Sequence, residues 1–487
     1  MSIKNDSDKI AIGINNLKDL FVLNPGFSFS IPDYQRPYVW DKEKLATLFK
    51  DISEELDPNI PEQVYYMGAI LLHQKNGKSL EIIDGQQRIT TLLILDYIIN
   101  AESSLILNRE DQLQLFYNSP VSQENIVSNE QYIINNKEHF FSNNQLNNIL
   151  EKLIFTVIVT KSEDDAFVFF DTQNNRGVKL SAVDFLKSYH LKALKGENEE
   201  TDKQRIAAKN WDKSNQNQFL DMLFNVYLWR GRVWKGNKVD YENKDKILRE
   251  FQLRTRPKPK DDSISLFANS KNRLASSIIF SIKKGININT NNISLQISPI
   301  DYPFSFRQPI EKGMSFFLFT EKYNSLFRYI FLENHKDGTA LHQLREFYEI
   351  VYQASGFSHY FTDLFKLCII LYFDKFEDCK LLAFALWLDY LLGSYRIKQK
   401  SIVAQTPVKI LKEKNQNLLD IIDGAFLPDE IIEFLLSITQ EDYYDYQVSG
   451  NGVQGRYKRQ LEIYFEKPEN SELTSKQQWI NAKLQNY

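Results

Sequence analysis

The sequence predicts an α+β protein, with a mixed α/β N-terminal region followed by a mainly α-helical C-terminal region. Up to about residue 110, strand-like and helix-like patterns alternate, and a β-branched run follows at 153–159. From about residue 200 onward, only helical periodicity is evident. The 487 residues are about three times the usual length of one domain, so two or three domains are expected. We place the domains at 1–195 and 196–487.

A helix and a hairpin are the clearest N-terminal elements. Asp41 is a suitable N-cap for a helix over Lys42–Leu56, where apolar residues recur at helical spacing. Met67–Gln74 and Ser79–Ile83 flank Asn76-Gly77, which is a favoured two-residue turn between antiparallel strands. Two more strands are expected over Phe27–Ile31 and Leu153–Val159.

Helices account for most of the remaining chain. Residues 110–150 are polar and predict helices with loops, or an insertion. Ser181 and Asp184 form a variant of the capping box at the start of a helix over Ala182–Leu194. Further helices are expected over Gln218–Trp229, Met314–Leu332, Leu341–Ala354, Phe361–Phe373, Leu381–Tyr395 and Ile431–Leu436.

Composition excludes several classes of protein. Lys+Arg 59 against Asp+Glu 63 gives a net charge of −4, which argues against a chain that is basic throughout. The most apolar stretches, Leu364–Phe373 and Leu381–Leu388, are too short to span a membrane, and the N-terminus lacks an apolar signal segment. We therefore expect a soluble, cytoplasmic protein. Cys368 and Cys379 are too few for a disulfide scaffold, and both are expected in the core.

The sequence DGQQR, Asp84–Arg88, is the best candidate for chemistry. It lies between a predicted strand and a predicted helix, where a glycine turn exposes backbone N–H groups suited to phosphate oxygens. Arg88 offers a planar fork to a phosphate, and Asp84 could hold a divalent cation or orient Arg88. Gln86 and Gln87 could donate to a phosphate or position a water molecule. Hydroxyls that could face the same ligand belong to Thr90 and Thr91.

A purely structural interpretation of DGQQR is also open. Gly85 could serve only to start a helix, while Asp84 and Arg88 form an internal ion pair. From spacing alone this alternative is somewhat favoured.

Two other polar turns could contribute to a site. In IPDYQRPYVW, Ile31–Trp40, prolines restrict the backbone around Gln35 and Arg36, while the aromatic residues are expected to pack in the core. In Asn174-Asn175-Arg176-Gly177, a turn could present Asn175 and Arg176 to a ligand or simply connect two helices.

Residues 201–260 form a locally basic stretch, with 15 Lys/Arg against 7 Asp/Glu. Its end, RTRPKPK, could contact DNA phosphates through Arg254, Arg256, Lys258 and Lys260. Three tryptophans in the stretch could stack on bases or pack in a helical core, and the sequence does not decide between these. They are Trp211, Trp229 and Trp234.

Three motifs together resemble a known family. They are IPDYQRPYVW, DGQQRITTL (Asp84–Leu92) and FFDTQNNRGVKLSAVDFLK (Phe169–Lys187), in this order. The combination resembles the N-terminal domain of GmrSD-type modification-dependent restriction enzymes, also seen in SspE-type phage-defence proteins. The resemblance covers roughly residues 15–195.

The resemblance implies a fold similar to the ParB/sulfiredoxin fold and a nucleoside-triphosphate site coupled to DNA restriction. Asp84, Gln87 and Arg88 would be catalytic, with Asp84 binding Mg²⁺ or a polarised water, Gln87 orienting the nucleophile and Arg88 stabilising phosphate charge. The rest of the nucleotide site would consist of Gln35, Arg36, Gly85, Gln86, Thr90, Thr91, Asn175, Arg176 and Asp184.

The sequence departs from the family pattern in one respect. Many relatives end in an HNH nuclease domain, which needs histidine, whereas residues 360–487 contain none. We therefore expect a Mg²⁺-dependent NTPase subunit that acts on DNA with a separate nuclease partner and that can form oligomers. Two alternatives are a nucleotide- or DNA-sensing switch without turnover and a nuclease whose site is unrecognised.

Overall fold

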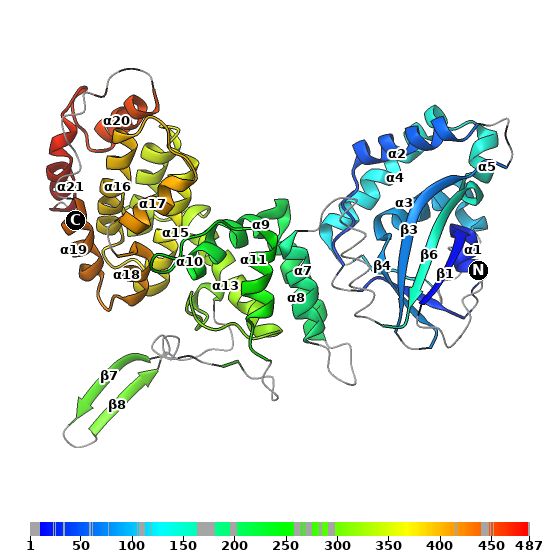
Figure 1. Ribbon diagram of the computed structural model, residues 1–487, viewed down its shortest axis with the longest axis horizontal. Coiled ribbons are helices and arrows are strands. Elements are labelled where there is room, and N and C mark those ends of the chain that lie inside the picture. Colours follow the sequence, from blue (N-terminus) through cyan, green and yellow to red (C-terminus); the bar gives the residue numbers. More distant parts are fainter. Residues whose placement is uncertain are drawn as a thin grey trace. The chain divides into compact units, whose positions relative to one another are not determined.

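The computed structural model divides the chain into two compact units, Met1–Gln216 and Asn217–Tyr487. The described residues are 10–485, without 23, 25, 33–34, 58–59, 61, 76, 105, 107–112, 118, 163–180, 195–201, 258–263, 266, 268–274, 282–284, 291–297, 414–415, 440–447, 449 and 451. The first unit contains a mixed sheet with helices and the second is mainly helical (Figure 1). The predicted α+β class is therefore confirmed.

A six-stranded sheet organises the first unit, in the order β1-β6-β3-β4-β2-β5. Its strands are β1 (Ile10–Asn16), β2 (Ser28–Ser30), β3 (Tyr65–Gln74), β4 (Ser79–Asp84), β5 (Leu113–Gln114) and β6 (Leu153–Thr160). β3 pairs antiparallel with β4 and parallel with β6, so it lies in the middle of the sheet. The register of β3 against β6 shifts between Tyr66 and Ala69, which marks a bulge around Gly68.

Helices cover the apolar face of this sheet and form the core with it. They are α1 (Leu17–Val22), α2 (Lys42–Glu55), α3 (Gln86–Asn100), α4 (Pro120–Phe140) and α5 (Asn143–Lys152), with a short 3₁₀ turn η1 (Ala101–Ser103) after α3. Two further helices of the first unit, α7 (Ala182–Lys192) and α8 (Asp202–Ser214), contact each other. Phe49, Leu92 and Ile133 from α2, α3 and α4 join Ile70 and Phe155 of the sheet in one buried cluster. Burial of this apolar surface is the main force that fixes α3 against β3 and β4.

Most of the N-terminal predictions are confirmed. Asp41 caps α2 by accepting a hydrogen bond from the Lys44 N–H, and β3 and β4 form the expected antiparallel pair. The capping box at α7 is present, since Ser181 and Asp184 exchange side-chain and backbone hydrogen bonds. The sequence did not predict β1, because IAIGINN lacks the alternation of apolar and polar residues that is typical of a half-buried strand.

Helices make up most of the described part of the second unit. They are α9 (Phe219–Met222), η3 (Leu223–Leu228), α10 (Trp229–Val233), α11 (Lys244–Leu248), η4 (Arg249–Leu253), η5 (Pro299–Asp301), α13 (Met314–Phe331), α14 (Ala340–Phe347), η6 (Tyr348–Gln353), α15 (His359–Phe376), α16 (Leu381–Lys398), α17 (Gln405–Glu413), α18 (Leu418–Gly424), α19 (Pro428–Thr439), α20 (Val453–Tyr464), η7 (Leu473–Ser475) and α21 (Lys476–Gln485). η2 (Gln216–Gln218) spans the division between the units. The described helices contain none that is long and apolar enough to cross a membrane.

Two expectations for the second unit are wrong. β7 (Ala275–Ser281) and β8 (Gly285–Thr290) form an antiparallel hairpin in a region predicted to be helical throughout. The prediction failed because apolar runs this short do not show whether the pattern repeats as in a helix or as in a strand. Cys379 is exposed in the turn between α15 and α16, whereas Cys368 is buried as expected. Of the two alternatives left open for the tryptophans, the structure favours core packing over base stacking, because Trp211 of the first unit and Trp229 and Trp234 of the second are all buried.

Candidate functional site

The DGQQR segment forms a tight turn between β4 and α3. Gly85 has φ +95°, a left-handed conformation that glycine adopts without strain, and a Cβ there would lie 2.9 Å from Cγ1 of Ile70. No side chain caps α3, so the first N–H groups of the helix, at Gln86, Gln87 and Arg88, have no intrahelical acceptor. The Asp84 carboxylate instead accepts from the Gly85 N–H at 2.8 Å. Among the described residues, the turn thus leaves the first N–H groups of α3 without an acceptor, at the positive end of the helix dipole.

Arg88 fixes the start of α3 to the bulge in β3. Its Nη1 donates to the Met67 carbonyl and its Nη2 to the Ala69 carbonyl, each at 2.7 Å. Nη2 also lies 3.5 Å from Oδ2 of Asp84. The internal Asp84–Arg88 pair considered above is therefore present, and the guanidinium is mainly engaged with backbone carbonyls. A Cβ on Gly68, which has φ +94°, would collide with Nη1 of Arg88.

Gly68→Ala is expected to destabilise the first unit more than Gly77→Ala does. Both glycines have positive φ, so alanine at either position adds backbone strain of about 1–2 kcal/mol. Only Gly68 adds a collision with Arg88, because nothing lies within 4 Å of a Cβ at Gly77. Urea unfolding of both variants measures the difference, and equal losses of stability would show that Arg88 is not held tightly by the bulge.

Gln87 connects α3 to the segment that contains the first motif. Its Oε1 accepts from the N–H groups of Val39 and Trp40 at 2.9 and 3.2 Å, and its Nε2 donates to the Pro37 carbonyl at 2.9 Å. All three contacts satisfy backbone groups of an irregular segment that lacks a strand partner. In this structure Gln87 therefore positions the loop that carries Gln35 and Arg36.

Gln86 is the unsatisfied polar residue of the site. The residue is 6% exposed, and its side-chain Oε1 makes no hydrogen bond within the described part of the chain. Buried polar atoms without a partner are rare because they lose hydration without compensation. An unpaired oxygen of this kind can accept a hydrogen bond from a ligand or water that donates, whereas the N–H groups at the helix start suit a ligand that accepts, such as a phosphate.

Thr90 and Thr91 are both buried and take part in separate hydrogen-bond networks. Thr90 donates to the Gln86 carbonyl at 2.8 Å, so the Tyr117 hydroxyl, 2.6 Å away, must donate to Thr90. Thr91 lies 2.7 Å from the Tyr38 hydroxyl, which also accepts from Asn129 of α4. Both threonines therefore fasten α3 to neighbouring segments, and neither hydroxyl is directed at the helix N-terminus.

Gln35 brings parts of all three motifs together. Its Nε2 donates to the Ile83 carbonyl at 2.7 Å, directly before DGQQR, and its own carbonyl accepts from Lys187 of α7 at 3.1 Å. Lys187 is buried and pairs with Asp212 of α8 at 2.8 Å. Sequence reasoning did not single out Lys187, although a lysine on a buried helical face is a recognisable signal.

Arg36 differs from Arg88 because it forms no hydrogen bond or ion pair to the described residues. Its guanidinium remains available for an anionic ligand next to the turn that Gln87 positions. Asp184 of the third motif is engaged in the capping box of α7. Asn175 and Arg176 lie outside the described residues.

The candidate DNA contacts in the second unit are partly described. Arg254 is exposed and pairs with Glu250 at 3.1 Å, while the exposed Arg256 lies over the ring of Phe267. Lys258 and Lys260 lie outside the described residues. Neither arginine has a geometry that selects a nucleic acid, so the contact with DNA stays a prediction.

Comparison with known proteins identifies both parts of the chain. Residues 17–191 match the model described as GmrSD restriction endonuclease, N-terminal domain, in agreement with the resemblance of the three motifs. Residues 203–450, just over half of the chain, match a family of unknown function, DUF7834. No curated protein matches the chain. The chain therefore belongs to the family of unknown function DUF7834 and carries, over residues 17–191, an N-terminal domain of the GmrSD restriction endonuclease family.

Proposed function

We propose that the first unit binds the phosphates of a nucleoside triphosphate at the N-terminus of α3 and hydrolyses the nucleotide within a bacterial restriction or phage-defence system. The observation that carries this proposal is the uncapped helix start after the left-handed Gly85. Helix N-termini of this kind bind phosphate through free N–H groups and the helix dipole. Membership of a restriction endonuclease family supports the biological setting.

The contacts suggest different roles for the residues of the motifs. The N–H groups of Gln86, Gln87 and Arg88 would hold the phosphates, and Arg36, which pairs with no described residue, would neutralise their charge. The side chains of Gln87 and Arg88 already have protein partners, so they would act as positioning residues. Asn175 and Arg176 would approach the phosphates from the third motif.

Asp84 fits the requirements of a magnesium site only together with the nucleotide. The described residues contain no group of three His, Cys, Asp or Glu that could hold a metal ion. However, Mg²⁺ commonly binds one or two carboxylates plus substrate phosphates, and Asp84 supplies one partly exposed carboxylate at the turn. When bound there, Mg²⁺ would neutralise charge on the phosphates.

Phosphate release tests this proposal directly. Purified protein with Mg²⁺ and each of four NTPs is expected to release phosphate, and Asp84→Asn is expected to slow release by about 100-fold. Asp51→Asn is the matched control because Asp51 is an exposed carboxylate on α2, away from the turn. Equal rates for wild type and Asp84→Asn would contradict a role for Asp84.

One observation favours a second candidate, a nucleotide-sensing switch without turnover. The side chains of both Gln87 and Arg88 are occupied by backbone contacts, which leaves neither free to orient a water molecule. A switch would bind NTP and Mg²⁺ but release little phosphate. In either case we propose that DNA cleavage depends on a separate nuclease, and that Arg254, Arg256, Lys258 and Lys260 contribute to DNA contact.

A further inference from the structure

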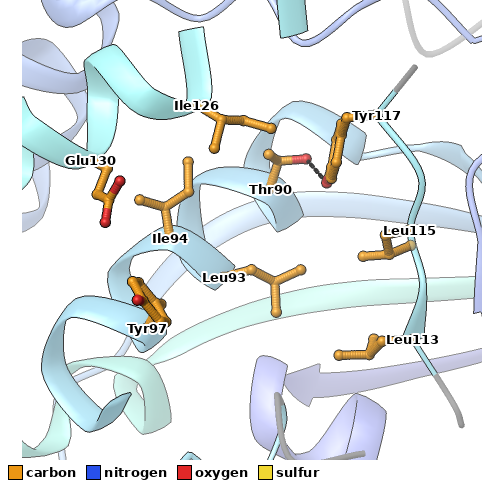
Figure 2. A pocket seen from close by; sticks show the side chains of 9 residues that line it. All are labelled: Thr90, Leu93, Ile94, Tyr97, Leu113, Leu115, Tyr117, Ile126 and Glu130. Carbon is orange, nitrogen blue, oxygen red and sulfur yellow. Dashed lines mark hydrogen bonds between the residues drawn. The ribbon is translucent and has the colours of Figure 1, made fainter. Parts of the chain in front are cut away.

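An apolar pocket lies along α3, directly after the DGQQR turn. Its volume is about 530 Å³, within the range of small-molecule sites. Figure 2 shows that α3, α4 and the segment around β5 supply its walls. The lining is mostly aliphatic, from Leu93, Ile94, Leu113, Leu115 and Ile126. Such a surface suits a flat, weakly polar ring more than a phosphate or a sugar.

Polar groups occur at both ends of the pocket. Glu130 of α4 and Tyr97 of α3 lie near one end, and Thr90 and Tyr117 near the other (Figure 2). Neither Glu130 nor Tyr97 forms a hydrogen bond or ion pair with a described residue, whereas Thr90 and Tyr117 bond to each other. Burial raises the pKa of Tyr117 to about 12, so its hydroxyl keeps the proton that it donates to Thr90. Glu130 therefore supplies the one carboxylate of the described pocket lining, an acceptor that carries a negative charge.

The pocket and the proposed phosphate site share one face of α3. Gln86, Thr90, Ile94 and Tyr97 are separated by four, four and three residues, so they line up along the helix. A helix rises about 1.5 Å per residue, which places Ile94 about 12 Å from Gln86 along the axis. A ribose with its phosphates can bridge a distance of this order.

We propose that this pocket binds the base of the nucleoside triphosphate and selects bases that carry an exocyclic amino group. This inference rests on the proposed function and specifies its substrate. A carboxylate accepts N–H hydrogen bonds, and charge-assisted bonds of this kind are among the stronger ones. Guanine fits best, because its N1–H and N2–H are parallel donors that can bind both carboxylate oxygens. Uracil fits worst, because two carbonyl oxygens flank its single N–H and repel the carboxylate.

Binding calorimetry on the full chain tests the inference. The ligands are GTP, ATP, CTP, UTP and inorganic triphosphate, each with Mg²⁺. Wild type is expected to bind GTP at least about tenfold more tightly than UTP, as one charge-assisted hydrogen bond allows. Glu130→Gln is expected to reduce this ratio to about threefold or less, because the amide offers one acceptor and no charge. Glu124→Gln, on the exposed side of α4, is the matched control and should keep the wild-type ratio.

The outcomes separate the base pocket from the phosphate site. If inorganic triphosphate and all four NTPs bind equally, or if Glu130→Gln keeps the wild-type preference, the base pocket is refuted while the phosphate site stands. If neither triphosphate nor any NTP binds, both proposals are refuted. As a second variant, Leu93→Trp fills the pocket and should weaken NTP binding without affecting inorganic triphosphate. Equal weakening of both ligands would also count against the base pocket.

Discussion

Replacing Arg88 by alanine is expected to lower the free energy of unfolding of the first unit by about 2–4 kcal/mol and to abolish nucleotide binding. The guanidinium donates to the carbonyls of Met67 and Ala69, so its removal leaves two backbone acceptors without a partner at the centre of the sheet. The start of α3 would lose its attachment to β3. Urea unfolding measures the first effect and NTP calorimetry the second.

Arg88→Lys and Arg36→Ala are the controls for this prediction. Lysine keeps the charge but cannot span both carbonyls with a planar fork, so it should restore only part of the stability. Arg36→Ala should leave stability nearly unchanged, because Arg36 contacts no described residue through a hydrogen bond or ion pair, but it should weaken NTP binding. Normal stability of Arg88→Ala would show that Arg88 contributes to ligand binding alone.

Asp389→Ala is expected to destabilise the second unit by about 3–5 kcal/mol. Asp389 of α16 pairs with Lys476 of α21 at 2.6 Å, and both side chains are almost completely buried. The Tyr457 hydroxyl of α20 lies 3.0 and 3.1 Å from the two carboxylate oxygens. Burial lowers the pKa of Lys476, while Asp389 opposes that shift. Without the carboxylate, the buried ammonium group has lost its counter-charge, or the lysine loses its proton at a cost in free energy.

Chemical denaturation of two further variants checks the cause. Asp389→Leu combined with Lys476→Met removes both charges and should recover most of the lost stability, because apolar residues of similar size can replace a buried pair. Asp429→Ala disrupts the exposed pair with Lys380 and should change stability little. A double variant as unstable as Asp389→Ala would indicate that lost packing, and not an unpaired charge, causes the effect.

The sequence predicts the elements of the site better than their contacts. The strand, glycine turn and helix around DGQQR follow from local patterns, and so does the capping box at Ser181 and Asp184. The partners of Arg88 and Gln87 depend on non-local features, namely a bulge in β3 and an irregular segment at residues 37–40. Local periodicity carries no information about either feature.

The base pocket could not be predicted for a similar reason. Its walls come from α3, from the segment at residues 113–117 and from α4, which the sequence places in a polar stretch of uncertain structure. Glu130 has no neighbouring motif that would distinguish it from other acidic residues on an amphipathic helix. Only the packing of α4 against α3 brings its carboxylate to a pocket.

Hydrogen exchange at the backbone amides of Gln86, Gln87 and Arg88 tests the central claim most directly. These N–H groups lie at the start of α3, where no intrahelical acceptor is available. With Mg²⁺ and a saturating NTP, the account predicts slower exchange at these amides than in the free protein. NTP binding that leaves their exchange unchanged, while protecting amides elsewhere in the chain, would contradict a phosphate site at the N-terminus of α3.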